Sequence, residues 1–140
     1  MYKIDRNITG LDWNEVLSIY HAVGWTRHTL IALQTIYSNS SHVAAAYAGS
    51  QLAGLGRALS DGVFNAAIYD VIIHPQFQRK GVGKLVVEDL LNQLKDISCV
   101  HLISTTSNEP FYEKAGLKSA KTAMARYLNK DLEAEYLVEK

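Results

Sequence analysis

Residues 70–84 read Asp-Val-Ile-Ile-His-Pro-Gln-Phe-Gln-Arg-Lys-Gly-Val-Gly-Lys, and an amphipathic segment from Leu85 to Lys95 follows them. The apolar run predicts a buried strand that Pro75 ends. After the glycines, the apolar spacing predicts a helix with one apolar side, made of Val82, Val86, Leu90 and Leu94. The basic loop between the strand and the helix offers backbone amides to a phosphate. The stretch therefore predicts a strand, an anion-binding loop and a helix in series.

Upstream of this stretch, the sequence predicts an antiparallel meander. Its three strands, joined by short turns, are Val43–Tyr47, Leu52–Leu59 and a strand from Phe64 or Ala66 to Ile73. Two helices are expected before the meander. The first is capped by Asp12 with support from Glu15 and runs to about His21, and the second covers residues 30–37. Residues 2–6 predict a first strand.

Downstream, residues 100–104 predict another short strand. Because a helix separates it from the strand that ends at Ile73, the two strands are expected to be parallel neighbours. Pro110 can open a short helix over residues 111–115, with Gly116 as its stop. Residues 124–128 predict a last strand, and the charged tail, residues 129–140, has no predicted role.

Composition limits the class of protein. A chain of 140 residues predicts a single domain over residues 1–140, with 14 basic and 14 acidic residues in balance. No overall field favours nucleic acid or an anionic membrane, so neither is an expected partner. Cys99 is the single cysteine, the five histidines are scattered, and no metal site is expected. Without an apolar run of membrane-spanning length, we expect a soluble cytoplasmic protein.

The glycine loop departs from two common phosphate motifs. A dinucleotide fingerprint would need a third glycine at position 86, which is Val86. A nucleoside-triphosphate loop would need glycine at position 78 and Ser or Thr at position 85, where the chain has Gln78 and Leu85. What remains is Gln-x-x-Gly-x-Gly at residues 78–83, between a strand and an amphipathic helix.

With its setting, this motif resembles that of the Gcn5-related N-acetyltransferase (GNAT) superfamily. Residues 111–117, Phe-Tyr-Glu-Lys-Ala-Gly-Leu, are similar to a second signature of that family. The order of elements extends the resemblance over most of residues 1–128. Segments such as Gly24-Trp25-Thr26 and Gly56-Arg57 look like a subset of small bacterial and plastid members, some of which acetylate arylalkylamines.

The resemblance implies a fold and a reaction. The fold would be α/β (α+β), a mixed, mostly antiparallel sheet of six or seven strands with helices on both faces. Its two parallel strands would splay apart to admit the cofactor. The reaction would be transfer of acetyl from acetyl-CoA to a primary amine of a small molecule, protein or peptide, by direct attack in a ternary complex. A homodimer is a further expectation.

Cofactor-binding residues are expected in three segments. Amides of the loop would converge on the pyrophosphate with help from basic side chains, and the loop comprises Gln78, Arg79, Lys80, Gly81, Val82, Gly83 and Lys84. By family analogy, backbone groups of Val71, Ile72 and Ile73 would pair with the pantetheine arm. The third segment contributes Asn108, Phe111 and Tyr112.

Two residues are expected to be catalytic. The hydroxyl of Tyr112 would act as general acid and protonate the leaving thiolate. Asp70 is the candidate base, because Ile68, Asp70 and Ile72 would share one strand face and surround the carboxylate with apolar groups. An equally weighted alternative is that Asp70 ties down a neighbouring loop by hydrogen bonds. Trp25 and Arg57 are the candidate acceptor residues.

Two other function classes stay open on the sequence. A catalytically silent acyl-CoA-binding or sensing domain would keep the loop and need no acid, which makes Tyr112 an argument against it. A nucleotide-binding module would bind ATP or NAD at the same loop.

Overall fold

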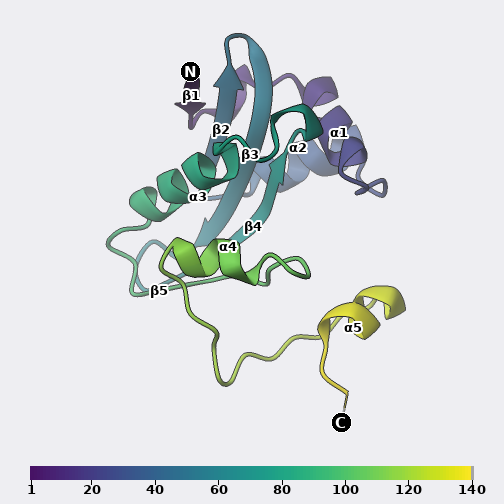
Figure 1. Ribbon diagram of the computed structural model, residues 1–140, viewed down its shortest axis with the longest axis vertical. Helices are drawn as coiled ribbons and strands as arrows, with labels where there is room; N and C mark the ends of the chain where they lie inside the picture. The colour runs from purple at the N-terminus through teal and green to yellow at the C-terminus, as the bar shows by residue number, and fades with distance from the viewer. Residues whose placement is uncertain (140) are drawn as a thin grey trace. The chain divides into compact units, whose positions relative to one another are not determined.

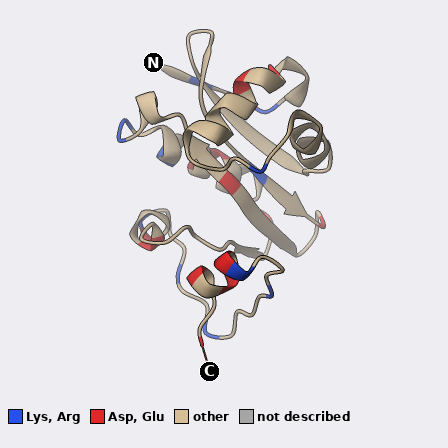
Figure 2. Cartoon of the chain, turned by 90° about the vertical axis from the view of Figure 1, so that its right-hand side faces the viewer, with Lys and Arg blue, Asp and Glu red and all other residues tan. Residues whose placement is uncertain are grey.

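The computed structural model describes residues 1–139, which fold into two compact units (Figure 1). The first unit is Met1–Leu102, and the second begins at Ile103. The expectation of one domain over residues 1–140 stays a prediction. Charges of both signs interleave within each unit (Figure 2).

A mixed sheet of five strands organises the first unit. In the order in which they pair, the strands are β1 (Tyr2–Asp5), β2 (His42–Ala48), β3 (Gln51–Ser60), β4 (Asn65–Ile73) and β5 (Cys99–His101). The first three pairings are antiparallel, and β4 and β5 are parallel, as predicted. The fold class is confirmed, whereas the predicted strand number of six or seven was too high for the described residues.

Helices α1 (Trp13–Ala22) and α2 (Leu30–Ser38) cover one face of the sheet, after a short 3-10 turn at Ile8–Gly10. The Asp12 side chain caps α1, because it accepts from the amides of Asn14 and Glu15. Glu15 does not close the predicted capping box. Its carboxylate instead accepts from the amide of Leu52 at 2.8 Å, which ties α1 to the start of β3.

Helix α3 (Val82–Gln93) covers the opposite face of the sheet, so helices on both faces are confirmed (Figure 1). Its predicted apolar side is buried, with Val86 and Leu90 fully enclosed, and burial of such side chains stabilises the fold by about 1.5–3 kcal/mol each. Two glycines of β3 permit this close packing. A Cβ atom at Gly54 would lie 3.1 Å from the Val82 side chain of α3, and one at Gly56 would lie 2.9 Å from that of Val86.

The second unit contains α4 (Glu109–Lys114) and α5 (Lys130–Tyr136). The prediction of a last strand at residues 124–128 was wrong, because that segment is not in a strand. Met124 and Leu128 are 93% and 82% exposed, and a strand pattern without a pairing partner does not form a sheet. The tail, which had no predicted role, supplies α5.

The turn between β3 and β4 is organised by Asp61. Its Oδ1 accepts from the amides of Val63, Phe64 and Asn65, and these bonds lower the pKa of Asp61 to about 2. A carboxyl whose pKa is lowered by folding stabilises the fold above its unfolded value of about 3.9, and loses that contribution as the pH falls through about 2.

Replacing Asp61 by alanine is therefore expected to lower the melting temperature at pH 7. The difference from wild type should shrink between about pH 4 and pH 2, where wild-type Asp61 becomes protonated. Thermal unfolding followed by circular dichroism at several pH values measures this. Asp96→Ala, which removes an exposed carboxylate, is the control. A difference that is the same at pH 7 and at the lowest pH reached would contradict the assignment.

Candidate active site

The loop between β4 and α3 presents a row of backbone amides. Residue Arg79 has φ 63° and Gly81 has φ 85°, so left-handed residues alternate with ordinary ones, and such alternation aims successive amides into one concavity. Gly81 occupies the N-cap of α3, where it provides no side-chain cap. Among the described residues, no hydrogen-bond acceptor is found for the amides of residues 79–84. The loop therefore has the donors and the helix dipole that an anion requires.

The side chains of the loop divide into two groups. Gln78 donates from Nε2 to the carbonyl oxygen of Ile73 at 3.1 Å, and so ties the start of the loop to the end of β4. The basic side chains are exposed. Lys84 lies 3.7 Å from Glu88, and the ammonium of Lys80 lies 5.9 Å from the centre of the Phe77 ring. Gln78 thus positions the loop, and the basic groups lie at its surface.

Strand β4 extends beyond its pairing with β5. The parallel pairing ends at Ala67 and His101, six residues before β4 ends at Ile73. The amide of His74 donates to Ala53 of β3, so strand alternation directs the backbone groups of Ile72 to β3 and those of Val71 and Ile73 to the outer edge. The carbonyl of Ile73 is already bonded to Gln78. An extended ligand can therefore pair with the free groups of β4 as an added strand.

A β-bulge interrupts β4 at Asp70. Leu55 pairs with Ile72 and Arg57 with Tyr69, so a single residue of β3, Gly56, faces two residues of β4. Asp70 has φ 53°, a left-handed conformation that aspartate tolerates better than most residues.

The bulge overturns the expectation that Ile68, Asp70 and Ile72 share one face. Ile68 packs in the core beneath α3, whereas Ile72 packs in the core beneath α1 and α2. The extra residue reverses the alternation beyond it, so the consecutive residues Tyr69 and Asp70 both lie on the α1–α2 side. Arg57 touches both: its guanidinium carbon lies 5.1 Å from the centre of the Tyr69 ring, and its Nε lies 3.0 Å from Asp70 Oδ2.

Polar groups, rather than apolar ones, surround the Asp70 carboxylate. Its Oδ2 accepts from Arg57 Nε and from the Tyr20 hydroxyl, both at 3.0 Å. The Tyr20 hydroxyl also lies 2.9 Å from the Tyr37 hydroxyl, and Arg57 Nη1 donates to Ser40 Oγ at 3.3 Å. These contacts join α1, α2, β3 and β4 around one carboxylate. We call Tyr20, Tyr37, Ser40, Arg57 and Asp70 the Asp70 network.

Trp25, the other candidate acceptor residue, belongs to an aromatic cluster beside this network. Its ring centre lies 5.8 Å from that of Tyr20 and 6.1 Å from that of His28, with the His28 ring nearly parallel. His28 also packs against Tyr20, at 4.8 Å. Through Tyr20, the structure brings together Trp25, Arg57 and Asp70, which are far apart in the sequence.

The remaining predicted residues lie in the second unit. Asn108 precedes α4, and its side-chain amide donates to Thr105 Oγ1. The rings of Phe111 and Tyr112 pack edge to face at 4.9 Å. Burial raises the pKa of the Tyr112 phenol, so it stays protonated at neutral pH and can donate a proton. Whether these residues act with the loop stays a prediction.

Sequence reasoning missed Tyr37 and Ser40. Both appeared to be ordinary core or loop residues, because their partners are distant in the sequence. A buried tyrosine hydroxyl needs a hydrogen-bond partner, and this requirement is the only signal that points to Tyr37.

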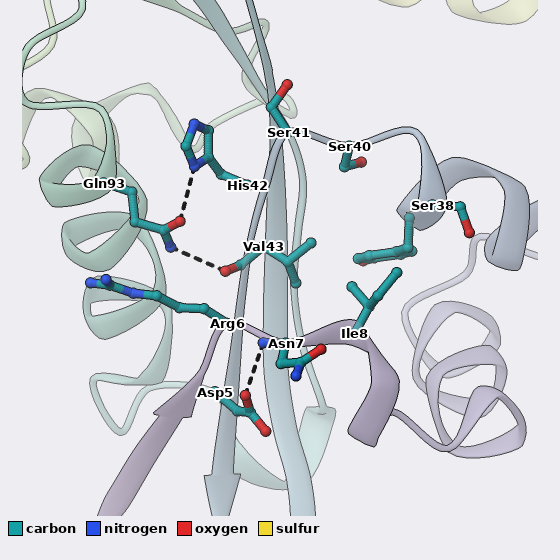
Figure 3. A pocket seen from close by; sticks show the side chains of 11 residues that line it. Asp5, Arg6, Asn7, Ile8, Ser38, Ser40, Ser41, His42, Val43 and Gln93 are labelled. Atoms are coloured by element: carbon teal, nitrogen blue, oxygen red, sulfur yellow. Dashed lines mark hydrogen bonds between the residues drawn. The ribbon is translucent and has the colours of Figure 1, made fainter. Parts of the chain in front are cut away.

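A pocket of about 440 Å³ lies beyond the end of β1 (Figure 3). Gln93 of α3 lines it: its Oε1 accepts from His42 Nδ1 at 3.1 Å, and its Nε2 donates to the carbonyl of Val43 at 3.1 Å. Its lining includes Tyr37 and Ser40 of the Asp70 network. None of the site residues predicted from the sequence lines this pocket.

Among residues 1–139, no helix is long and apolar enough to cross a membrane. Within residues 1–139, no group of three or more His, Cys, Asp or Glu side chains is arranged to hold a metal ion.

Several known proteins are similar to this chain. A family model described as an acetyltransferase (GNAT) domain matches residues 17–127. An uncharacterized N-acetyltransferase of Pyropia yezoensis is 38% identical over 126 residues, which cover 81% of this chain and 72% of that protein. Serotonin N-acetyltransferase 2, chloroplastic, of Oryza sativa subsp. japonica is 31% identical over 121 residues, covering 82% of this chain and 60% of that protein.

A solved structure is also similar. The GNAT-family acetyltransferase of Streptococcus pneumoniae TIGR4 superposes with a TM-score of 0.80 at 27% identity, covering 93% of this chain and 99% of that one. The match of the family model over most of the sequence, together with these relatives, shows that the chain belongs to the GNAT acetyltransferase family.

Proposed function

We propose that this protein transfers the acetyl group of acetyl-CoA to a primary amine. The observation that carries the proposal is the row of backbone amides at residues 79–84, for which no acceptor is found among the described residues. This row lies next to the part of β4 that extends beyond its pairing with β5. The first feature suits a pyrophosphate and the second suits the amide-containing pantetheine arm. No side-chain cap at Gly81 competes with a bound anion.

The proposed chemistry is direct attack in a ternary complex. The nitrogen of the free amine attacks the thioester carbonyl carbon and forms a carbon–nitrogen bond. The carbon–sulfur bond then breaks, so that the acetyl group is bound to the amine and the thiolate of CoA leaves. Asp70, directly or through water, takes the proton that the amine gives up. Tyr112 supplies a proton to the departing thiolate, and its raised pKa keeps that proton available at neutral pH. Both protons are thereby accounted for without a covalent acyl-enzyme.

The surroundings of Asp70 bear on the acceptor. The carboxylate, the Tyr69 ring and the Trp25–His28 cluster all associate with the α1–α2 side of the sheet. A carboxylate and aromatic rings together suit an ammonium on an aromatic side chain. One relative is named for acetylation of serotonin, an amine of this kind. We therefore propose aromatic primary amines as the first acceptors to test.

An acceptor screen tests this function. Thiol release from saturating acetyl-CoA is measured with tryptamine, phenethylamine, spermidine and a lysine-containing peptide. Turnover with at least one amine is expected, with the aromatic amines fastest. Tight acetyl-CoA binding without turnover on any amine would favour an acyl-CoA sensor. In calorimetry, competition by ATP or NAD would favour a nucleotide-binding module.

Two further expectations from the sequence concern the whole protein and stay predictions. Sedimentation analysis tests the homodimer. Location in the cytoplasm is tested by fractionation, with a plastid as the alternative because one relative is named as chloroplastic.

A further inference from the structure

The two oxygens of the Asp70 carboxylate have unequal surroundings. Oδ2 accepts from both Tyr20 and Arg57, whereas no hydrogen bond to Oδ1 is found within residues 1–139. The Asp70 side chain is 15% exposed, and Oδ1 is not among the enclosed polar atoms without a partner. Oδ1 therefore keeps some contact with solvent, and it is the oxygen that has no partner and can accept from an incoming group.

The direction of the hydrogen bonds at Oδ2 follows from counting protons. The Tyr20 hydroxyl has one proton and donates it to Asp70, so the Tyr37 hydroxyl must donate its proton to the Tyr20 oxygen. Burial is the main cause that raises the pKa of both phenols, which keeps both hydroxyls protonated. The result is a one-way chain from Tyr37 through Tyr20 to Oδ2, and such chains strengthen each bond.

Both donors to Oδ2 are themselves held by residues of α2 or of the segment directly after it. Tyr37 bonds to Tyr20, and Ser40 accepts from Arg57. Tyr20 and Tyr37 are 0% and 1% exposed, and their hydroxyls are bonded to each other and, through Tyr20, to Asp70. The Tyr20 hydroxyl therefore acts on the site through the carboxylate. The bulge turns this carboxylate toward α1 and α2, and two fixed donors prevent it from rotating about its χ2 angle.

We propose that Tyr20 is a positioning residue for acetyl transfer, which together with Arg57 holds Oδ2 so that Oδ1 faces the acceptor amine. Tyr37 supports it by donating to the Tyr20 oxygen. This inference rests on the proposed function, in which Asp70 takes the proton of the amine. The proposal gives the ion pair between Asp70 and Arg57 a role. Arg57 and Tyr20 orient the carboxylate through Oδ2, and Oδ1 takes the proton from the amine.

The test is a double-mutant cycle with Tyr20→Phe and Asp70→Asn, using the best amine of the acceptor screen. In the wild-type background, Tyr20→Phe should lower kcat/KM for the amine by about tenfold or more, and leave KM for acetyl-CoA within about twofold. In the Asp70→Asn background, Tyr20→Phe should have almost no further effect, because there is no carboxylate to orient. Tyr37→Phe, which leaves the bond from Tyr20 to Asp70, should cause a smaller loss.

The outcomes separate the inference from the function. An equal loss from Tyr20→Phe in both backgrounds would mean a structural role and overturn the inference, as would no loss at all. If Tyr20→Phe does not fold, Tyr37→Phe takes its place in the cycle under the same criterion. A wild-type protein without turnover would overturn the proposed acetyl transfer itself. An Asp70→Asn variant as active as wild type would overturn the role of Asp70 and this inference, but leave acetyl transfer standing.

Discussion

Replacement of Gly81 by glutamate is expected to abolish acetyl-CoA binding while leaving the fold intact. Gly81 has φ 85°, where a residue with a Cβ atom is strained by about 1–2 kcal/mol, and no atom lies within 4 Å of a Cβ built there. The new carboxylate would therefore not disturb the core. It would instead enter the anion site, where it repels a pyrophosphate and competes for the amides of residues 79–84. We expect an increase in Kd of about 100-fold or more, roughly 3 kcal/mol, by calorimetry.

A matched control is available at Gly49, in the turn between β2 and β3. It has φ 62° and open space at its Cβ position, so Gly49→Glu introduces the same charge and comparable backbone strain away from the loop. This variant should bind acetyl-CoA as the wild type does. Gly81→Ala separates strain from charge, and should weaken binding much less than Gly81→Glu. An unchanged Kd for Gly81→Glu would remove the loop from the cofactor site.

Replacement of Tyr112 by phenylalanine is expected to lower kcat by about 100- to 1,000-fold, the range for loss of a general acid. Binding of acetyl-CoA should change little, because the ring and its edge-to-face contact with Phe111 are kept. The thiol of the leaving group has a pKa near that of a cysteine thiol, about 8.5. Above that pH the free thiolate is stable in water, so its protonation by a general acid contributes less to the rate. The deficit of Tyr112→Phe relative to wild type should therefore narrow above about pH 9.

Tyr136→Phe is the control for this variant. Tyr136 lies in the same unit and stacks on Tyr127, with ring centres 5.7 Å apart, but has no proposed part in the reaction. Removal of the Tyr136 hydroxyl should leave kcat unchanged. A Tyr112→Phe variant that keeps at least half of the wild-type kcat, with acetyl-CoA still bound, would exclude Tyr112 as the acid. A loss of acetyl-CoA affinity as large as the loss of kcat would assign Tyr112 to binding instead.

Local signals in the sequence were sufficient for most of the first unit. The Asp12 cap, the apolar side of α3, the glycine loop and the parallel relation of β4 to β5 were all predicted and are present. Each of these features depends on residues that are close in the sequence or on a short strand-helix-strand connection. The residue pattern of a short stretch is therefore enough to predict it. The same local signal failed at residues 124–128, because a strand also needs a partner.

The surroundings of Asp70 show why the rest could not be read in advance. A bulge depends on how two strands pair, and one extra residue reversed the faces predicted for Ile68 and Ile72. The Glu15 carboxylate does not form the predicted capping box, because it accepts a hydrogen bond from the amide of Leu52, 37 residues away. Tyr20 and Asp70 are separated by 50 residues, and no periodicity links them.

The sequence by itself thus determined the family and the strand, loop and helix at residues 70–95, because a glycine turn at a helix start is a local property of the chain. The tertiary structure alone decided the polar network around Asp70 and which carboxylate oxygen stays open. Hydrogen bonds between buried side chains depend on distances of about 3 Å in space. Only the packing of α1 and α2 on the bulged sheet brings the Tyr20 hydroxyl within that reach of Tyr37 and of Asp70, beside the Asp70–Arg57 ion pair.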